Sequence, residues 1–156
     1  MRRRLVLLSI VACNVQAQPQ APSQAQLQRQ VQPSAPAQWF TVTGNPEDAS
    51  MDTVQVDPVA TEVEGQFKTM NVRVSRARQR LNWENVPYRS YESKVVFDCR
   101  ARKAGYTFAT FYPQPLWQGA PNKSTDYSRN PQPMLFRDVE PNPMQRIIRA
   151  ACQSGG

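Results

Sequence analysis

The sequence predicts an α+β fold that is mainly β: an antiparallel sheet with a C-terminal helix packed on one face and linked to it by a disulfide. Three observations predict this fold. Several segments between residues 39 and 112 alternate apolar and polar residues, which is the period of a strand. Residues 144–152 change to a helical spacing. Two cysteines, Cys99 and Cys152, fall one in a strand and one in the helix.

The first two expected strands are short and end at turn-forming residues. The run from Trp39 to Thr43 is apolar and β-branched and stops at a Gly-Asn-Pro turn. The segment from Met51 to Val56 alternates, with Val54 on its apolar face, and an Asp-Pro pair ends it.

The next expected strands are longer. One opens after Gly65, and its apolar face consists of Met70, Val72 and Val74. Another runs over residues 88–99, and its apolar face consists of Tyr91, Val95, Phe97 and Cys99. We expect a tight turn at Lys103-Ala104-Gly105 and a partner strand over 106–112, which complete a hairpin.

The region that follows is rich in proline. Residues 113–133 resist regular assignment, although Leu116 and Trp117 should be anchored against the domain. Residues 134–139 form one last expected strand.

The C-terminal segment has the pattern of a helix. Asn142 is a good N-cap and Pro143 suits the first helical position. The apolar stripe of this helix consists of Met144, Ile147, Ile148, Ala151 and Cys152. Because Cys152 lies on this stripe and Cys99 on the apolar face of its strand, we expect the helix to pack on one face of the sheet.

Residues 1–17 are typical of a secretory signal peptide. Three arginines precede an apolar run from Leu5 to Ala12, which is too short to span roughly 30 Å of hydrocarbon as a helix. Cleavage after Ala17 would leave Gln18 as the new terminus. Alternatively, Cys13 follows a sequence that resembles a bacterial lipobox and would then carry a lipid. Both alternatives export the chain.

Export also determines which cysteines can form a disulfide. Cys13 is lipidated or removed in both alternatives, which leaves Cys99 and Cys152 in an oxidising compartment. These two cysteines are 152 − 99 = 53 residues apart and are expected to form a disulfide. A buried, reduced pair is the alternative.

Composition divides the rest of the chain. Residues 18–37 are almost entirely Gln, Pro, Ala and Ser and predict a disordered linker. Residues 38–153 form the folded domain, and 154–156 a disordered tail. Without the three signal-peptide arginines, 16 basic residues face 12 acidic ones, so the net charge falls from +7 to +4. This modest excess, in an exported chain, argues against a nucleic-acid partner.

The composition also excludes several kinds of enzyme. The chain has no histidine, so it has no Ser-His-Asp triad, Cys-His pair or His-ligated zinc or haem. The acidic residues between Glu47 and Glu64 mark no cleft and contain no calcium-loop motif. We therefore expect no enzyme, no metal and no cofactor.

The strand Tyr88-Arg89-Ser90-Tyr91-Glu92-Ser93-Lys94-Val95-Val96-Phe97-Asp98-Cys99, the opening Trp39 strand and the terminal helix with Cys152 resemble the surface-adhesin protein E family. The resemblance covers about Gln38 to Cys152. It implies a Gram-negative outer-membrane or surface protein whose sheet is curved and whose C-terminal helix is disulfide-linked to that sheet. Known members bind host proteins such as vitronectin, laminin or plasminogen.

A basic and aromatic cluster is the candidate binding surface. Its members are Arg73, Arg76, Arg78, Arg80, Arg89, Tyr88 and Tyr106. Arginine gives bidentate contacts to carboxylate, phosphate and sulfate groups. Three of these arginines continue the parity of the apolar face, so the strand must end or bulge near Ser75, or they emerge beyond the edge of the sheet. The alternative is a solvated strand end paired with acids, for which the acidic stretch offers partners.

Together these features predict an exported, non-enzymatic binding protein at the outer membrane, on the cell surface or in the periplasm of a Gram-negative bacterium. Its expected partner is an extracellular or envelope protein, or an anionic glycan, and it meets the membrane only through a lipid on Cys13. The alternative function is a periplasmic or outer-membrane structural protein that assists envelope assembly.

Overall fold

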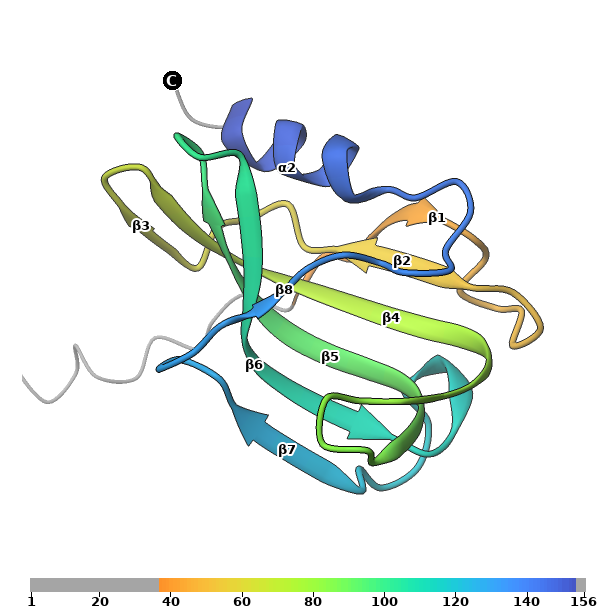
Figure 1. Ribbon diagram of the computed structural model, residues 1–156. Coiled ribbons are helices and arrows are strands. Elements are labelled where there is room, and N and C mark those ends of the chain that lie inside the picture. Colours follow the sequence, from red (N-terminus) through yellow and green to blue (C-terminus); the bar gives the residue numbers. More distant parts are fainter. Residues whose placement is uncertain (1–36, 154–156) are drawn as a thin grey trace, which may run out of the picture. The chain divides into compact units, whose positions relative to one another are not determined.

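The computed structural model describes residues 37–153, which form a curved, unclosed antiparallel sheet with one helix on it (Figure 1). The sheet has eight strands in the order β1-β2-β4-β5-β6-β7, with β3 paired to β4 and β8 paired to β6. The strands are β1 Phe40–Thr43, β2 Thr53–Val56, β3 Glu62–Glu64, β4 Phe67–Leu81, β5 Pro87–Asp98, β6 Lys103–Tyr112, β7 Lys123–Asp126 and β8 Gln132–Pro133. A short 3₁₀ turn, η2, spans Pro115–Trp117, and the helix α2 spans Met144–Gln153. The predicted fold class is confirmed.

The predicted signal peptide, the lipidation candidate Cys13 and the tail 154–156 lie outside the described residues, as does the linker up to residue 36. These parts of the domain assignment stay predictions.

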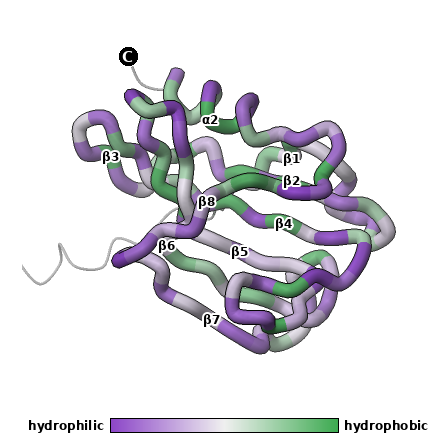
Figure 2. Tube along the Cα trace, in the orientation of Figure 1, coloured by the Kyte–Doolittle hydropathy of each residue, from purple (hydrophilic) through white to green (hydrophobic). Residues whose placement is uncertain are grey.

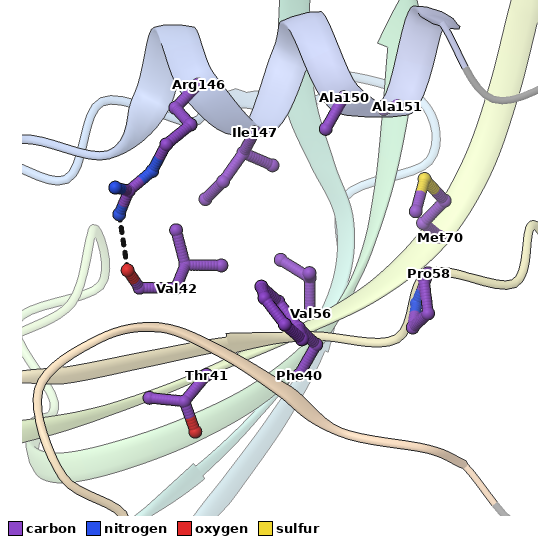
Figure 3. Close-up of a pocket in the computed structure, with 10 residues that line it drawn as sticks. All are labelled: Phe40, Thr41, Val42, Val56, Pro58, Met70, Arg146, Ile147, Ala150 and Ala151. Carbon is purple, nitrogen blue, oxygen red and sulfur yellow. Dashed lines mark hydrogen bonds between the residues drawn. The ribbon is translucent and has the colours of Figure 1, made fainter.

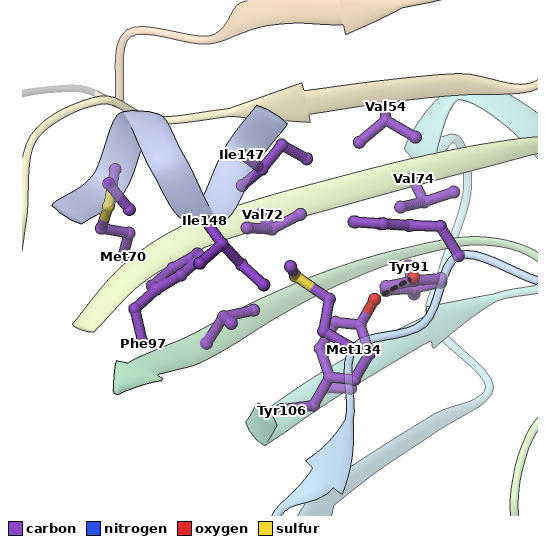
Figure 4. Close-up of a cluster of buried hydrophobic side chains, with 14 of the residues drawn as sticks. Val54, Met70, Val72, Val74, Tyr91, Phe97, Tyr106, Met134, Ile147 and Ile148 are labelled. Carbon is purple, nitrogen blue, oxygen red and sulfur yellow. Dashed lines mark hydrogen bonds between the residues drawn. The ribbon is translucent and has the colours of Figure 1, made fainter. Parts of the chain in front are cut away.

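One core fills the space between the sheet and α2 (Figure 4). Hydrophobic and hydrophilic residues alternate along β4 and along α2 (Figure 2), so each presents one apolar face. The buried side chains of the sheet include Val54, Val72, Val74, Val95 and Phe97. Those of α2 are Ile147, Ile148 and Ala151, and burial of each isoleucine contributes about 1.5–3 kcal/mol to stability.

The start of α2 follows the prediction. The Asn142 side-chain oxygen accepts the backbone N–H of Met144 at 3.0 Å, which satisfies one of the unpaired donors of the first turn. The Asn142 amide nitrogen donates to the carbonyls of Leu135 and Phe136 at 2.9 and 3.2 Å. Asn142 therefore caps the helix and ties its first turn to the preceding segment.

The predicted disulfide is present. Cys99, directly after β5, is bonded to Cys152 near the end of α2, with the two Cα atoms 5.3 Å apart. A ten-residue helix is marginal in water by itself. The apolar stripe and the disulfide thus hold α2 on the sheet together.

A bulge of several residues interrupts β4 near Ser75, which is one of the alternatives that the sequence left open. Pairing with β5 runs without a break to Ser75 opposite Ser90 and resumes only at Arg80 opposite Tyr88. Residues 76–79 of β4 therefore lie opposite Arg89 alone. Bulges of this kind bend a strand and increase its twist.

Two contacts satisfy the backbone of this bulge. The Asp52 carboxylate accepts the N–H of Ala77 at 2.7 Å. The Arg89 side chain donates to the carbonyl of Arg76 at 2.9 Å and to that of Ala49 at 3.0 Å. The acidic and basic stretches of the sequence meet here.

The predicted turn at Lys103-Ala104-Gly105 is wrong, because these residues already belong to β6. The turn spans residues 99–102, and Arg102 supplies its positive φ of 53°. The Asp98 carboxylate accepts the N–H groups of Arg100 and Ala101 at 3.1 and 2.9 Å. A side-chain-stabilised turn thus replaces the expected glycine turn.

The proline-rich region is more regular than predicted. It contains β7, whose sequence Lys-Ser-Thr-Asp is polar throughout and therefore shows no apolar alternation. It also contains β8 and η2, and the indole N–H of Trp117 donates to the carbonyl of Tyr91 at 3.0 Å, which anchors the tryptophan as expected.

The strand predicted over residues 134–139 is also wrong. Phe136 and Asp138 have positive φ values of 42° and 61°, and Val139 N–H donates to the Phe136 carbonyl, so the chain turns here. The side chains of Met134, Phe136 and Val139 are nevertheless buried in the core. These apolar residues contribute to the core although the backbone between them is not extended.

We predict that Cys99→Ala and Cys152→Ala destabilise the domain by similar amounts, up to about 4 kcal/mol for a closed loop of 53 residues. Either change frees the same loop in the unfolded chain. Urea unfolding of the two single variants, with the double variant as control, measures the loss. A double variant much less stable than either single one would contradict a shared bond.

Candidate functional site

The structure separates the seven residues of the predicted binding surface. Arg73 lies on the face of the sheet opposite α2, since its neighbours Val72 and Val74 point into the core. Arg76, Arg80 and Tyr88 line one cavity. The remaining three are Arg78, Arg89 and Tyr106, of which Arg78 is exposed and Tyr106 is buried. They do not form one continuous surface.

Arg73 is engaged within the domain. Its guanidinium lies over the rings of Trp39 and Trp117, 4.2 and 3.9 Å from their centroids. Its Nε donates to the Gln55 side chain at 2.7 Å, and Glu92 pairs with it at 3.6 Å. Cation–π contacts of this kind contribute about 0.5–2 kcal/mol. Arg73 thus fixes both tryptophans on the outer face of the sheet.

Arg76 is the most buried of the arginines, with 5 % of its surface exposed. Its guanidinium donates to the carbonyl of Arg137 at 3.0 Å and pairs with Asp52 at 3.6 Å. The acidic stretch therefore neutralises at least one arginine inside the domain, as the sequence alternative expected. Arg80 pairs in the same way with Asp138 at 3.6 Å, although this pair is more exposed.

Tyr106 belongs to a buried aromatic cluster. Its hydroxyl lies 2.7 Å from that of Tyr91, and its ring lies edge-on to the Tyr91 ring. Tyr88 and Phe111 extend the cluster, with their ring centroids 5.2 Å apart. Burial raises the pKa of Tyr91 and that of Tyr106 above the ordinary value of 10.0. Tyr106 is thus a core residue with a satisfied hydroxyl.

An apolar groove between α2 and the first strands was not predicted from the sequence (Figure 3). Its volume is about 480 Å³, within the range of pockets that hold ligands. Its walls are formed by Phe40, Thr41, Val42, Val56, Pro58, Met70, Arg146, Ile147, Ala150 and Ala151.

Side-chain size explains why the groove is open. Beside Arg146 and Ile147, the helix faces it with Ala150 and Ala151, which have the smallest side chains of the lining. Phe40 on the other wall is 63 % exposed, which is high for so large an apolar residue. The sequence shows Phe40 only as one residue of an apolar run, and its exposure and its neighbours across the groove are set by tertiary packing.

Arg146 is the charged residue at the groove. Its guanidinium donates to the carbonyl of Val42, the residue at which the pairing of β1 with β2 shifts register. The contact links α2 to the edge of the sheet and places a cation beside the apolar walls (Figure 3).

The part of the chain that the structure describes is residues 37–153. It contains no group of three or more His, Cys, Asp or Glu residues placed to bind a metal ion. None of its helices is long and apolar enough to cross a membrane.

The sequence model of the surface-adhesin protein E family matches residues 39–153, nearly the whole described domain. The chain belongs to this family. No curated protein and no solved structure gave a match. Membership in the surface-adhesin protein E family indicates an exported, surface-exposed adhesin that binds extracellular molecules, and it implies a non-enzymatic role.

We predict that the stability of the domain falls steeply above about pH 10. Because Tyr91 and Tyr106 have raised pKa values when folded, the unfolded chain loses these protons first, and each tyrosine costs about 1.4 kcal/mol per further pH unit. Replacing both by phenylalanine should flatten this decline and change stability little at pH 7. Urea unfolding between pH 7 and 11 measures the free energy of unfolding of both proteins. If that free energy falls with pH as steeply in the double variant as in the original protein, the two tyrosines are not the cause.

Proposed function

We propose that this protein is an exported, non-enzymatic surface adhesin that binds a host extracellular protein by taking up an apolar side chain in the groove beside α2. The observation that supports the proposal is the open groove itself, in a domain of an adhesin family. Interfaces of binding proteins commonly centre on one buried apolar anchor surrounded by polar contacts.

The lining of the groove fits such an anchor. Phe40 offers an aromatic face, and Met70 at the far wall has a flexible side chain that adapts to different shapes. The volume of about 480 Å³ is large enough for an aromatic or branched side chain with part of its backbone. The disulfide and Asn142 hold the α2 wall in place, so the groove is formed before the partner arrives.

Charge selects among partner segments. The helix α2 carries Arg146 and Arg149 and no acidic residue, and Arg146 lies at the groove. A segment with a carboxylate next to its apolar anchor therefore has the complementary charge, which favours association and orients the segment. We infer that the bound segment combines an apolar anchor with a neighbouring Asp or Glu.

Export and display are also part of this proposal. The N-terminal sequence supports a signal peptide, followed either by a lipid on Cys13 or by release at Gln18. The linker from residue 18 to 37 would then separate the domain from the membrane. The anionic glycan that the sequence analysis predicts as a partner of the basic residues is a separate prediction, which does not depend on the groove.

We predict that protease added to intact cells releases the domain. An adhesin must face outward, so a C-terminal epitope should disappear from the cell fraction while a periplasmic marker protein stays intact. Retention of the full-length epitope would favour the periplasmic or envelope-assembly alternative.

We predict that Phe40→Ala weakens binding to the host protein about tenfold or more, as expected for an anchor pocket. Vitronectin, laminin and plasminogen, coated singly, serve as probes. Phe108→Ala is the matched control, because Phe108 is 38 % exposed and lines a separate cavity that shares no residue with the groove. Equal effects of the two substitutions would contradict the role of the groove.

A further inference from the structure

A second cavity lies beyond the bulge of β4 and is lined by both cationic and aromatic residues. It has a volume of about 240 Å³ and shares no residue with the apolar groove. Arg76 and Arg80 contribute from β4 and Tyr88 from β5. Leu81, Trp83 and Phe136 contribute apolar walls. The bulge creates this arrangement. By the alternation of β4, Arg76 and Arg80 would point to the apolar face, and the bulge lets both line the cavity instead.

Both arginines have unused hydrogen-bond donors. Within residues 37–153, Arg76 Nε and Arg80 Nε are buried and have no hydrogen-bond partner. The Arg76 side chain is only 6 % exposed, and its one hydrogen bond within that range goes to the Arg137 carbonyl. A buried donor without a partner is costly, so each one in a native structure calls for an explanation, and a bound acceptor is one.

The hydroxyl of Tyr88 adds a third donor. Its ring is fixed against Tyr91 and Phe111, with centroid distances of 5.6 and 5.2 Å. Burial raises the pKa of Tyr88, so its hydroxyl stays protonated at neutral pH. This hydroxyl makes no hydrogen bond within the described part of the chain, and Tyr88 lines the cavity.

Two of the apolar residues of the cavity, Leu81 and Trp83, are partly exposed. Leu81 is 60 % and Trp83 48 % exposed. The Trp83 ring packs on Tyr106 and Tyr127, with 5.5 Å between centroids in each pair. An indole fixed in this way presents a surface on which a small aromatic or branched group can pack.

The charges at the cavity favour a monovalent anion. The arginines at positions 76, 80 and 137 line it together with Asp138, which pairs with Arg80. Asp52 pairs with Arg76 from outside the lining. Three positive and two negative groups leave an excess of +1. A carboxylate balances this excess and accepts from guanidinium and hydroxyl donors together, whereas a phosphate monoester carries about −1.5 to −2.

We propose that this cavity binds a carboxylate attached to an aromatic or branched apolar group. The carboxylate lies against the guanidinium groups of Arg76 and Arg80 and the hydroxyl of Tyr88, and the apolar group packs on Trp83 and Leu81. Either a free aromatic acid or the C-terminal residue of a peptide carries this chemistry. The site does not depend on the groove, so its failure would leave the proposed adhesin function untouched.

The test is a titration of the ¹⁵N-labelled chain, followed by NMR at the Trp83 indole and the arginine Nε–H signals. N-acetyl-L-phenylalanine should bind with a Kd on the order of millimolar, as expected for so small a ligand. N-acetyl-L-phenylalaninamide, which lacks the carboxylate, should bind at least tenfold more weakly. Comparing phenylacetate with Gly-Gly-Phe then assigns the source: the tighter ligand identifies a free acid or a chain end.

Matched variants distinguish binding in the cavity from a general electrostatic attraction of the ligand to the basic domain. Arg80→Gln should weaken N-acetyl-L-phenylalanine at least tenfold, while Arg78→Gln, with the same charge change on an exposed neighbour outside the cavity, should leave Kd within about twofold. Tyr88→Phe gives a second, milder loss, and dispersed spectra show that each variant is folded. Equal binding of acid and amide, equal effects of the two arginine variants, or no shift at about 20 mM ligand would each overturn the proposal.

Discussion

The attachment of α2 to the curved sheet is the interaction on which both cavities and the core depend. The helix is too short to persist alone, and its isoleucines cover the inner face of β4 and β5. Its far end is bonded through Cys152 to Cys99, and its near end is capped by Asn142, which also binds the segment 135–136. Loss of this attachment would expose the inner face of the sheet, remove one wall of the groove and release the segment that carries Phe136.

The sequence carried enough information for the layers of the fold but less for the connections between strands. Alternation with period two identified β4 and β5, and the helical stripe together with the cysteines identified α2 and its position, because these signals come from the core itself. The polar strand β7 left no such signal. Residues 134–139 have the composition of a strand, yet turns at Phe136 and Asp138 prevent one, since packing against the core overrides local propensity there.

The candidate sites were less accessible to sequence reasoning than the fold. The cluster of arginines was visible, and so was the parity conflict that the bulge resolves. The bulge inserts three extra residues into β4, and this number decides which arginines line the same cavity. The spacing of the basic residues in the sequence does not specify the length of the bulge. Arg73 shows the same limit: its contact with Trp39 and Trp117 joins segments far apart in the chain, and it turns an expected surface cation into a structural one.

The contact of Arg146 with the carbonyl of Val42 affects whether the edge of the sheet can pair with a strand of another molecule. Open edges of a sheet are templates for pairing between molecules, and β1 is one such edge. Here the edge strand is only four residues long, shifts register at Val42 and has that carbonyl already occupied by a guanidinium. At the other edge, β7 begins and ends with the charged residues Lys123 and Asp126. Strands β1 and β7 are therefore poorly suited to pairing with a strand of another molecule.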